Sequence, residues 1–314
     1  MHKNIILRLS NEVGNQMFMY AAAYSIAKKM NRSLFLDDQT AFLLKKNISS
    51  YGLNHFKINA PIVSDNFKFK NTKGYLKRKF LIKTDFMRIK KRFFIENKDK
   101  NKFTDFSLDL LKETFDNNFY LEGHFESEKY FNDIKDDIKN EFTFKNNDLF
   151  KKNFFYQDIK NFNSIGVCLR QNRFLEGRGK NNNISRIKSE NFTIEQINYI
   201  NRAVDVVKTK INNPKFFLWS NDLISIPKNK FNFDYTCVDT SGITKDVDNR
   251  ILSLFLLKNC KHFITTTSSF NWWGAWLSSN TNKLVFRPSD KNFSNYKINN
   301  KDFWPNDWFK IDPS

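Results

Sequence analysis

The chain has 314 residues, of which 40% are apolar, so it is long enough for two domains of ordinary size with packed cores. Its 9 Gly and 6 Pro exclude a linker-rich or low-complexity protein. The formal charge of +19 is typical of a protein that meets nucleic acid, anionic lipid or a phosphate-bearing substrate, or of a Lys-rich solvated surface. Cys168, Cys237 and Cys260 are too widely spaced for a disulfide framework or a zinc site, and they favour a reducing, cytoplasmic setting.

The N-terminal segment predicts a strand, a loop, a helix and a second strand. Asn4–Leu9 is a short apolar strand, too short for the core of a signal peptide. Met17–Met30 has the apolar spacing of a helix, and Asn31 is expected to end it in the left-handed conformation. A strand that follows from Ser33 completes a unit typical of parallel sheets. The sequence has no run near the ~20 apolar residues that a membrane-spanning helix needs.

From Asn66 to Lys102 the sequence interleaves Phe with fourteen Lys or Arg residues and three acidic residues. We interpret this stretch first as an insertion in the first domain, with its Phe side chains inward and its Lys side chains outward. Two other interpretations stay open. One is a face that lies on a membrane surface with snorkelling lysines, and the other is an RNA-binding strip.

The second half repeats the alternation of strands and helices. We place the domain boundary in the polar stretch around residues 146–163, which divides the chain into domains 1–155 and 156–314. A capping-box pattern of Thr193 and Gln196 predicts a helix start, and Asn249–Cys260 predicts another helix. The expected strands of this half are Ser164–Leu169, Lys215–Ser220, Asp234–Asp239, Lys261–Thr266 and Lys283–Pro288.

Polar side chains follow three of these strands at the point where each strand ends. Ligands of open α/β sheets bind beyond the carboxyl ends of the strands. A helix that begins near Ser269 would also present unpaired N–H groups and a positive dipole end to an anion such as a diphosphate. We therefore expect an edge that binds an anionic ligand there, with the candidate residues Arg170, Ser220, Asn221, Asp222, Thr267, Ser268, Ser269 and Phe270.

Several of these residues also have a plainer interpretation. Arg170 could aim a guanidinium fork at a phosphate or form a surface salt bridge. Asp222 could accept hydrogen bonds from a base or ribose, or start a turn. The tryptophans of Trp272–Trp276 are expected in the core, with Gly274 allowing a neighbour to approach closely. Asp246–Asp248 has the look of a metal-binding acidic pair, but it precedes a helix, where Asp commonly caps, so we expect no metal.

The loop Ser10–Gln16 lacks the glycine pattern of a phosphate loop. Glu12 in this loop would also repel a nearby diphosphate. Gly14, Asn15 and Gln16 are therefore expected to face the sugar or the acceptor rather than the nucleotide.

Five segments together resemble the bacterial α-1,2-fucosyltransferases of glycosyltransferase family 11. The long tryptophan motif, "LLKNCKHFITTTSSFNWWGAWLSS", is the most specific of them. The others, in chain order, are "VGNQMFMYAAAYSIAKK", "GHFESEKYF", "LWSND" and "FWPNDWFKI". The resemblance spans nearly the whole chain in order.

The resemblance implies a GT-B type α/β fold of two facing Rossmann-like domains with mainly parallel sheets. It implies an N-terminal acceptor-side domain with a basic insertion at 66–102, a C-terminal GDP-sugar-binding domain, and a C-terminal tail that packs back on the first domain. It also implies GDP-fucose as donor, inversion at the anomeric carbon, no required metal, and a galactoside acceptor on a lipid-linked surface glycan or O-antigen. A cytoplasmic protein, peripheral at the inner face of an anionic membrane and with no nucleic acid partner, would suit this reaction. The alternatives are a transferase for another GDP-sugar and a non-catalytic basic protein that binds RNA or membrane.

One segment departs from the family pattern His-x-Arg-Arg-x-Asp. Here the stretch reads Cys168-Leu169-Arg170-Gln171-Asn172-Arg173, which retains the first Arg and bears on the choice of sugar and acceptor. Arg170 is expected to stabilise the charge on the β-phosphate of the leaving GDP. The candidate catalytic residues are Arg170, Asn15 and Glu126. Glu126, Asp222 and Glu176 are unranked candidates for a general base, and a loose transition state would need none.

Overall fold

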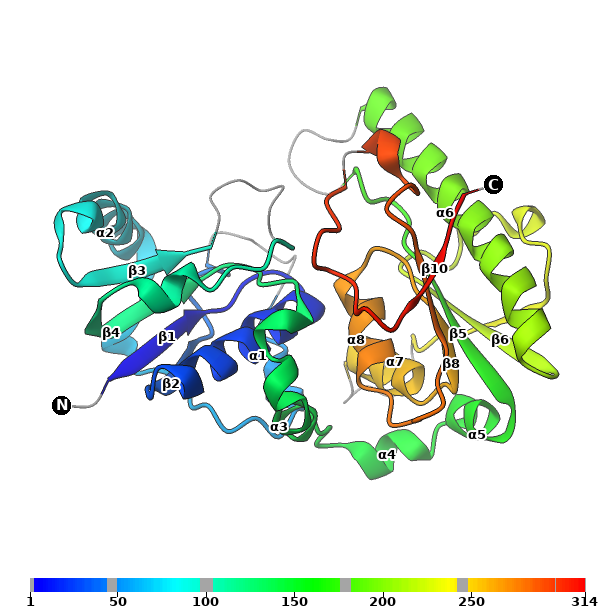
Figure 1. Cartoon of the computed structure of the whole chain (residues 1–314), viewed down its shortest axis with the longest axis horizontal. Coiled ribbons are helices and arrows are strands. Elements are labelled where there is room, and N and C mark those ends of the chain that lie inside the picture. Colours follow the sequence, from blue (N-terminus) through cyan, green and yellow to red (C-terminus); the bar gives the residue numbers. More distant parts are fainter. Residues whose placement is uncertain are drawn as a thin grey trace. The chain divides into compact units, whose positions relative to one another are not determined.

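The computed structural model describes residues 3–43, 50–96, 104–175, 182–241, 248–296 and 298–313. The chain forms two compact units, each an α/β structure built on a parallel sheet (Figure 1). Unit 1 comprises Met1–Lys145 and Asn299–Pro305, and unit 2 comprises Asn146–Ile298 and Asn306–Ser314. The units thus divide at residues 145 and 146, ten residues before the boundary placed from the sequence.

The sheet of unit 1 has the strand order β2-β1-β4-β3. Its strands are β1 (Asn4–Arg8), β2 (Ser33–Asp37), β3 (Lys91–Ile95) and β4 (Phe115–Glu122), and all neighbouring pairs are parallel. Helix α1 (Val13–Lys29) connects β1 to β2, which confirms the predicted strand–helix–strand unit. Asn31 has a φ of 49°, the left-handed conformation expected for the residue that ends α1.

Helix α1 begins four residues earlier than the sequence predicts. Glu12 occupies the N-cap position, and its carbonyl accepts the Gln16 N–H at 3.1 Å. Gly14, Asn15 and Gln16 therefore lie in the first turn of the helix, and their assignment to a loop is wrong. Gly and Asn have poor intrinsic helix propensity, but burial of this turn in the packed unit overrides that preference.

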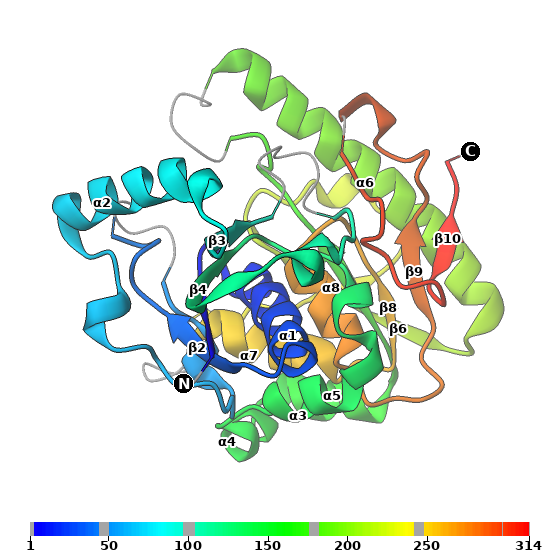
Figure 2. The same ribbon diagram turned by 60° about the vertical axis from the view of Figure 1, so that its left-hand side comes forward.

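The basic segment supplies helix α2 (Asn71–Thr84) and then β3, which pairs with β4 at the edge of the sheet. Figures 1 and 2 both show α2 alongside β3. The later part of the described segment is thus a strand of the sheet, where the sequence predicts an insertion in the first domain. Phe69 and Phe93 point inward as predicted, but Phe80 and Phe86 are exposed, so the expectation that every Phe is buried is wrong.

The short segment Asn299–Pro305 belongs to unit 1 although it is far along the chain. The ring of Phe303 lies 6.1 Å from that of Phe18, centroid to centroid, and Asp302 accepts the Phe106 N–H at 3.0 Å. Helix α3 (Lys135–Glu141) completes the regular helices described in this unit.

Unit 2 contains a six-stranded parallel sheet of order β10-β9-β8-β5-β6-β7. Its strands are β5 (Asn163–Leu169), β6 (Pro214–Ser220), β7 (Tyr235–Cys237), β8 (His262–Ile264), β9 (Val285–Pro288) and β10 (Phe309–Ile311). The described helices are α4 (Asn147–Lys151), α5 (Phe154–Asn161), α6 (Asn183–Lys210), α7 (Asn249–Lys258) and α8 (Ser269–Trp276). Strand β10, which pairs with β9, was not anticipated.

Alternation along β5 shows how helices cover both faces of the sheet in unit 2. Ile165, Val167 and Leu169 pack with apolar residues of α6 in one buried cluster. Gly166 points to the opposite face, where a Cβ would lie 2.7 Å from Leu257 of α7. A strand buried on both faces reads as a continuous apolar run, which is why "SIGVCL" predicts a central parallel strand.

Helix α6 begins at Asn183, ten residues before the predicted capping box. Asn182 is the N-cap, and its side chain accepts the Ser185 N–H at 2.9 Å. Thr193 instead lies within the helix, where its hydroxyl donates to the Ser189 carbonyl at 2.9 Å. Asp248 caps α7 as expected, by accepting the Arg250 N–H at 2.9 Å. Within the described ranges, none of the helices is long and apolar enough to cross a membrane.

Candidate functional site

The carboxyl ends of three neighbouring strands form the candidate site in unit 2. Strands β8, β5 and β6 are adjacent and parallel, so the residues that follow them lie along one edge of the sheet, as predicted. These residues are Arg170 and Gln171 after β5, Ser220–Asp222 at the end of β6, and Thr267–Phe270 after β8. The topology thus brings together all eight donor-site candidates.

Arg170 is positioned through its backbone by a residue of α6. Its N–H donates to Gln196 Oε1 at 3.3 Å, and its carbonyl accepts from Gln196 Nε2 at 2.7 Å. Gln196 is fully buried. The capping-box pattern does not predict this positioning role of Gln196, but an amide on the buried stripe of α6 was a usable signal for it.

Gln171 ties the end of β5 to the end of β6. Its amide nitrogen donates to Ser220 Oγ at 2.9 Å and to the Asp222 carbonyl. Its backbone N–H donates to Asn221 Oδ1 at 2.7 Å, and Asn221 Nδ2 returns a bond to the Gln171 carbonyl at 3.1 Å. The Gln at this family-divergent position is therefore a buried structural link between two of the three strand ends.

Asp222 starts a turn, the plainer of its two interpretations. Its carboxylate accepts the Ser225 N–H at 3.2 Å and a bond from Asn172 Nδ2 at 3.2 Å. The hydrogen bond from the Ser225 backbone, together with the bonds from the Ser225 hydroxyl and Asn172, lowers the pKa of Asp222. This carboxylate is therefore stabilised in its charged form, which makes it a weak general base.

The N-terminus of α8 carries a guanidinium at its side. Arg173 Nη1 donates to the Thr267 carbonyl at 2.6 Å and to Thr267 Oγ1 at 3.1 Å. Ser268 is the N-cap, and its side chain makes no capping bond within this helix. The predicted start of α8 at Ser269 is confirmed, and the edge combines a cationic side chain with the positive end of a helix dipole.

Aromatic packing holds the body of α8. Trp272 and Trp273 are fully buried, and Trp272 stacks on Trp276 with ring centroids 5.8 Å apart. The prediction that these tryptophans form core is confirmed. Gly274 faces Leu257 of α7 so closely that a Cβ would lie 2.4 Å from it, which confirms the expected close approach.

Cys168 is buried, and this burial raises the pKa of its thiol. A thiol in this state is a small packing group rather than a nucleophile or ligand. Across the described ranges, no group of three or more His, Cys, Asp or Glu side chains is placed to hold a metal ion. Two earlier candidates, Asp246 and Glu176, lie outside the described residues.

Unit 1 holds a second polar cluster, where the first turn of α1 meets the segment after β4. Asn15 Nδ2 donates to Glu126 Oε1 at 2.8 Å and lies 3.1 Å from His124 Nδ1. His124 Nδ1 is 3.5 Å from Glu126 Oε1, and its Nε2 is 3.3 Å from Asn11 Nδ2. Asn15 and Glu126, both predicted from the sequence, therefore meet, and His124 is a further member that no sequence motif indicated.

The segment after β4 has an unusual backbone that places its side chains. Phe125 has a φ of 52°, a sparsely populated conformation for a bulky residue, and its ring is fully buried. Glu96 accepts the N–H groups of His124 and Phe125 at 2.6 and 2.8 Å, and burial raises its pKa to about 7. Glu96 and the Phe125 anchor therefore hold His124 and Glu126 in place.

Gln16 is buried and hydrogen-bonded within unit 1. It is 0% exposed, and its amide nitrogen donates to the carbonyls of Asn11 and Ser50 at 2.7 and 2.8 Å. Its Oε1 accepts the Gly52 N–H at 2.9 Å. With these bonds Gln16 joins α1 to neighbouring segments, and its contact with sugar or acceptor stays a prediction. Gly14 is also buried, in the first turn of α1.

The comparisons with known proteins agree on a class of enzyme. A model of the family described as Glycosyl transferase family 11 matches residues 2–312. An "Alpha-1,2-colitosyltransferase" of Escherichia coli is 26% identical over 324 residues, which cover 98% of this chain and 99% of that protein. The "O-antigen biosynthesis glycosyltransferase WbnK" of Escherichia coli is 25% identical over 297 residues, which cover 89% and 92% of the two chains.

The fold is similar to that of a solved fucosyltransferase, NodZ from Bradyrhizobium. The TM-score is 0.55 at 14% identity, with 87% of this chain and 92% of that chain covered. This likeness confirms the predicted α/β fold with two mainly parallel sheets. Since the family model extends over nearly all of the sequence, the non-catalytic alternative is set aside: the chain is a glycosyltransferase and belongs to glycosyl transferase family 11.

Proposed function

We propose that this protein transfers L-fucose from GDP-fucose to the 2-hydroxyl of a terminal galactoside, in α-1,2 linkage and with inversion at the anomeric carbon. The acceptor belongs to a cell-surface polysaccharide or lipopolysaccharide O-antigen that is assembled in the cytoplasm on a lipid carrier. No metal ion is required. The observation that carries the proposal is the cationic edge of unit 2, where Arg173 lies against the N-terminus of α8.

The electrostatics of that edge support a diphosphate. A guanidinium and the positive end of a helix dipole at the same edge both attract an anion. The diphosphate of a GDP-sugar supplies that anion, and its charge increases as the sugar–oxygen bond breaks. Arg170, the hydroxyls of Ser268 and Ser269, and the N–H groups of α8 are the donors proposed for the β-phosphate. Ser220, Asn221 and Phe270 are proposed to line the nucleoside side of the same edge.

Similar proteins support GDP-fucose as the donor. A structure of the NodZ α-1,6-fucosyltransferase was solved after soaking with GDP-fucose, and another after co-crystallisation with GDP. The relatives in Escherichia coli support the linkage and the pathway, since one is an α-1,2-transferase and the other is an O-antigen enzyme. None of these names fixes the sugar that this chain uses.

Glu126 is the proposed general base for the acceptor hydroxyl. Asn15 and His124 hold its carboxylate by the contacts described above, whereas Asp222 is engaged in a turn. Asn15, which donates to Glu126, is also proposed to help position the acceptor. Removing the hydroxyl proton as the sugar bond forms is the contribution expected of this carboxylate.

A second donor has a specific observation in its favour. The relative that is 26% identical over almost the whole chain transfers colitose, which is L-fucose without its 3-hydroxyl. The family-divergent segment from Cys168 to Arg173 lies at the donor edge, so a change of sugar is expected to arise there. GDP-colitose is therefore the alternative donor.

The test is GDP release by the purified protein with GDP-fucose, GDP-colitose or GDP-mannose and a panel of galactosides. Turnover that depends on GDP-fucose and is stimulated by one galactoside supports the proposal and identifies the acceptor. Turnover with GDP-colitose alone selects the alternative. Binding of none of the three sugars would refute a GDP-sugar site at this edge.

Arg170→Ala tests the role of the donor edge directly. Loss of a group that stabilises the leaving phosphate should reduce turnover by about 10²-fold or more. The matched control is Lys208→Ala, which removes an exposed cation from the last turn of α6, near the amino end of β6 and so at the opposite edge of the same sheet. Near-normal turnover of Arg170→Ala would remove Arg170 from the mechanism.

A further inference from the structure

Unit 1 displays a surface, here named the α2 patch, on which large apolar side chains are exposed. Its apolar members and their exposed fractions are Leu76 59%, Phe80 66%, Phe86 76%, Met87 66% and Ile89 91%. They lie on the outward side of α2 and in the turn that follows it, within fourteen residues of chain. Scattered exposed apolar residues are ordinary, but a group this dense marks an interaction surface.

Lysines alternate with these apolar side chains. Lys73, Lys77 and Lys83 are exposed on the same side of α2, and Lys90 is exposed after the turn. The only acidic residue between Asn71 and Ile95 is Asp85, which is buried. The α2 patch is therefore cationic as well as apolar.

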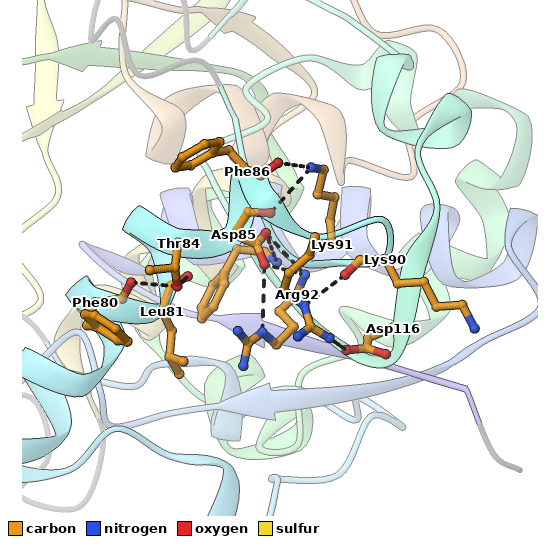
Figure 3. A network of polar contacts seen from close by, with 11 residues as sticks. Phe80, Leu81, Thr84, Asp85, Phe86, Lys90, Lys91, Arg92 and Asp116 are labelled. Atoms are coloured by element: carbon orange, nitrogen blue, oxygen red, sulfur yellow. Dashed lines mark hydrogen bonds and ion pairs between the residues drawn. The ribbon is translucent and has the colours of Figure 1, made fainter.

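Polar contacts beneath the patch hold its turn in one conformation (Figure 3). The Asp85 carboxylate accepts the N–H groups of Arg92 and Phe93 at 3.0 and 3.1 Å. Lys91 Nζ donates to the carbonyls of Asp85 and Phe86 at 3.4 and 3.2 Å. The hydroxyl of Thr84 closes the last turn of α2 through the Phe80 carbonyl at 3.1 Å.

The inner side of α2 is fastened to the sheet. Arg78 forms an ion pair with Glu122 at the end of β4, with Arg78 Nε 3.0 Å from Glu122 Oε1. A Cβ at Gly74 would lie 2.7 Å from the Phe69 backbone, so helix and chain are in close contact there. The exposed apolar side chains thus extend from a rigid support, and their exposure is a property of the folded unit.

We propose that the α2 patch docks the protein on the surface of an anionic phospholipid bilayer. At such a surface Leu76, Phe80 and the apolar side chains of the turn enter the boundary between headgroups and acyl chains, while the lysines meet lipid phosphates. The stems of the lysines lie along the apolar boundary and their ammonium groups reach outward. The inference stands independently of the donor that the enzyme uses.

The chemistry of the patch disfavours other occupants. A second copy of the chain would bring the same lysines against each other, and like charges in contact oppose association. Single-stranded nucleic acid binds through stacking on aromatic rings, but three of the five apolar members, Leu76, Met87 and Ile89, have no ring. A bilayer surface offers acyl chains to the apolar side chains and lipid phosphates to the lysines.

The experiment is sedimentation of the full chain with vesicles of phosphatidylcholine alone or mixed with phosphatidylglycerol. Leu76→Ser/Phe80→Ser removes apolar contact, and Lys77→Gln/Lys83→Gln removes charge. Ile224→Ser is the matched control, because Ile224 is 98% exposed but belongs to unit 2. Melting curves and GDP-release activity in solution, measured for each variant, show that fold and catalytic site are intact.

Binding is expected only to the mixed vesicles and should weaken with added salt. The apolar double substitution should reduce partitioning by about tenfold or more, and each lost lysine by about fivefold. Ile224→Ser should bind as the unmodified protein does. Absence of binding, equal binding to neutral vesicles, or a Leu76/Phe80 variant that matches the control would overturn the proposal. Capture of single-stranded RNA in place of vesicles, or a dimer that dissociates on the apolar double substitution, would overturn it equally.

Discussion

The substitution Gly274→Ala tests how α8, which carries the proposed donor edge, is fixed in unit 2. A Cβ at Gly274 would lie 2.4 Å from Leu257 Cδ2 and 2.6 Å from Leu257 Cγ. Leu257 is also closely packed on its other side, since a Cβ at Gly166 would lie 2.7 Å from its second methyl group, Cδ1. This side chain of α7 is therefore held between a glycine of β5 and a glycine of α8.

Two opposing contributions decide the effect on stability. Ala is favoured over Gly in a helix interior by about 1 kcal/mol. An extra methyl group in a packed core costs about 1–3 kcal/mol, and an overlap this deep with a buried, blocked side chain belongs at the upper end. We expect the free energy of unfolding to fall by about 2 kcal/mol, which lowers the Tm of a unit of this size by about 4–8 °C.

The assay is differential scanning calorimetry with and without GDP, which identifies the transition of the unit that binds it. Leu257→Ala alone costs about 2–5 kcal/mol of stability. In that background, the methyl group that Gly274→Ala adds has space. The double variant should be about 1–3 kcal/mol more stable than the two single effects predict together. Additive effects, or a higher Tm for Gly274→Ala alone, would show that helix propensity decides the outcome and would refute the reasoning.

Three further predictions concern the two polar clusters. Glu126→Gln should keep the bond from Asn15 but reduce turnover by about 10²-fold or more with GDP affinity unchanged; undiminished steady-state GDP release would exclude Glu126 as the base. Arg173→Ala should weaken GDP binding measured by titration calorimetry by about tenfold or more, since a hydrogen bond to a charged group contributes about 1.5–3 kcal/mol; an unchanged Kd would contradict the proposed diphosphate site. The pKa of Glu96 is raised from 4.5 to about 7, so the folded unit binds this proton more tightly than the unfolded chain does. Its contribution to stability is complete below pH 4.5 and is lost as the pH rises through about 7, by up to about 3 kcal/mol. Urea denaturation on both sides of this window should show the loss in the unmodified protein and not in Glu96→Gln; parallel curves would show that Glu96 does not titrate there.

Local patterns in the sequence were sufficient for most elements. The apolar run of β5, the helical spacing of α1 and the N-cap of α7 follow from residues that are neighbours along the chain. The residues after β5, β6 and β8 were predicted to share an edge because parallel strands bring their carboxyl ends together. The tryptophan motif of α8 was sufficient to indicate the family.

The errors at element boundaries have a common cause. The start of α1 contains Gly14 and Asn15, which propensity assigns to a loop, and packing of the unit decides otherwise. The capping box at Thr193 is a valid local signal that the longer helix α6 overrides. Strand β10 is only three residues long, and its pairing with β9 is not visible in its own sequence.

Local patterns along the chain were enough for the α/β class, most of the strands and helices, and the family. Which polar side chains meet at the candidate sites depends on the packing of the folded units. Asn15 meets Glu126 across 111 positions of sequence, and Gln171 meets Ser220 across 49. Such contacts depend on how strands and helices pack, and the period of a strand or helix carries no information about a partner so far away. For the same reason the exposure of Phe80 and the burial of Phe93, two Phe residues of one basic segment, could be decided only by the folded unit.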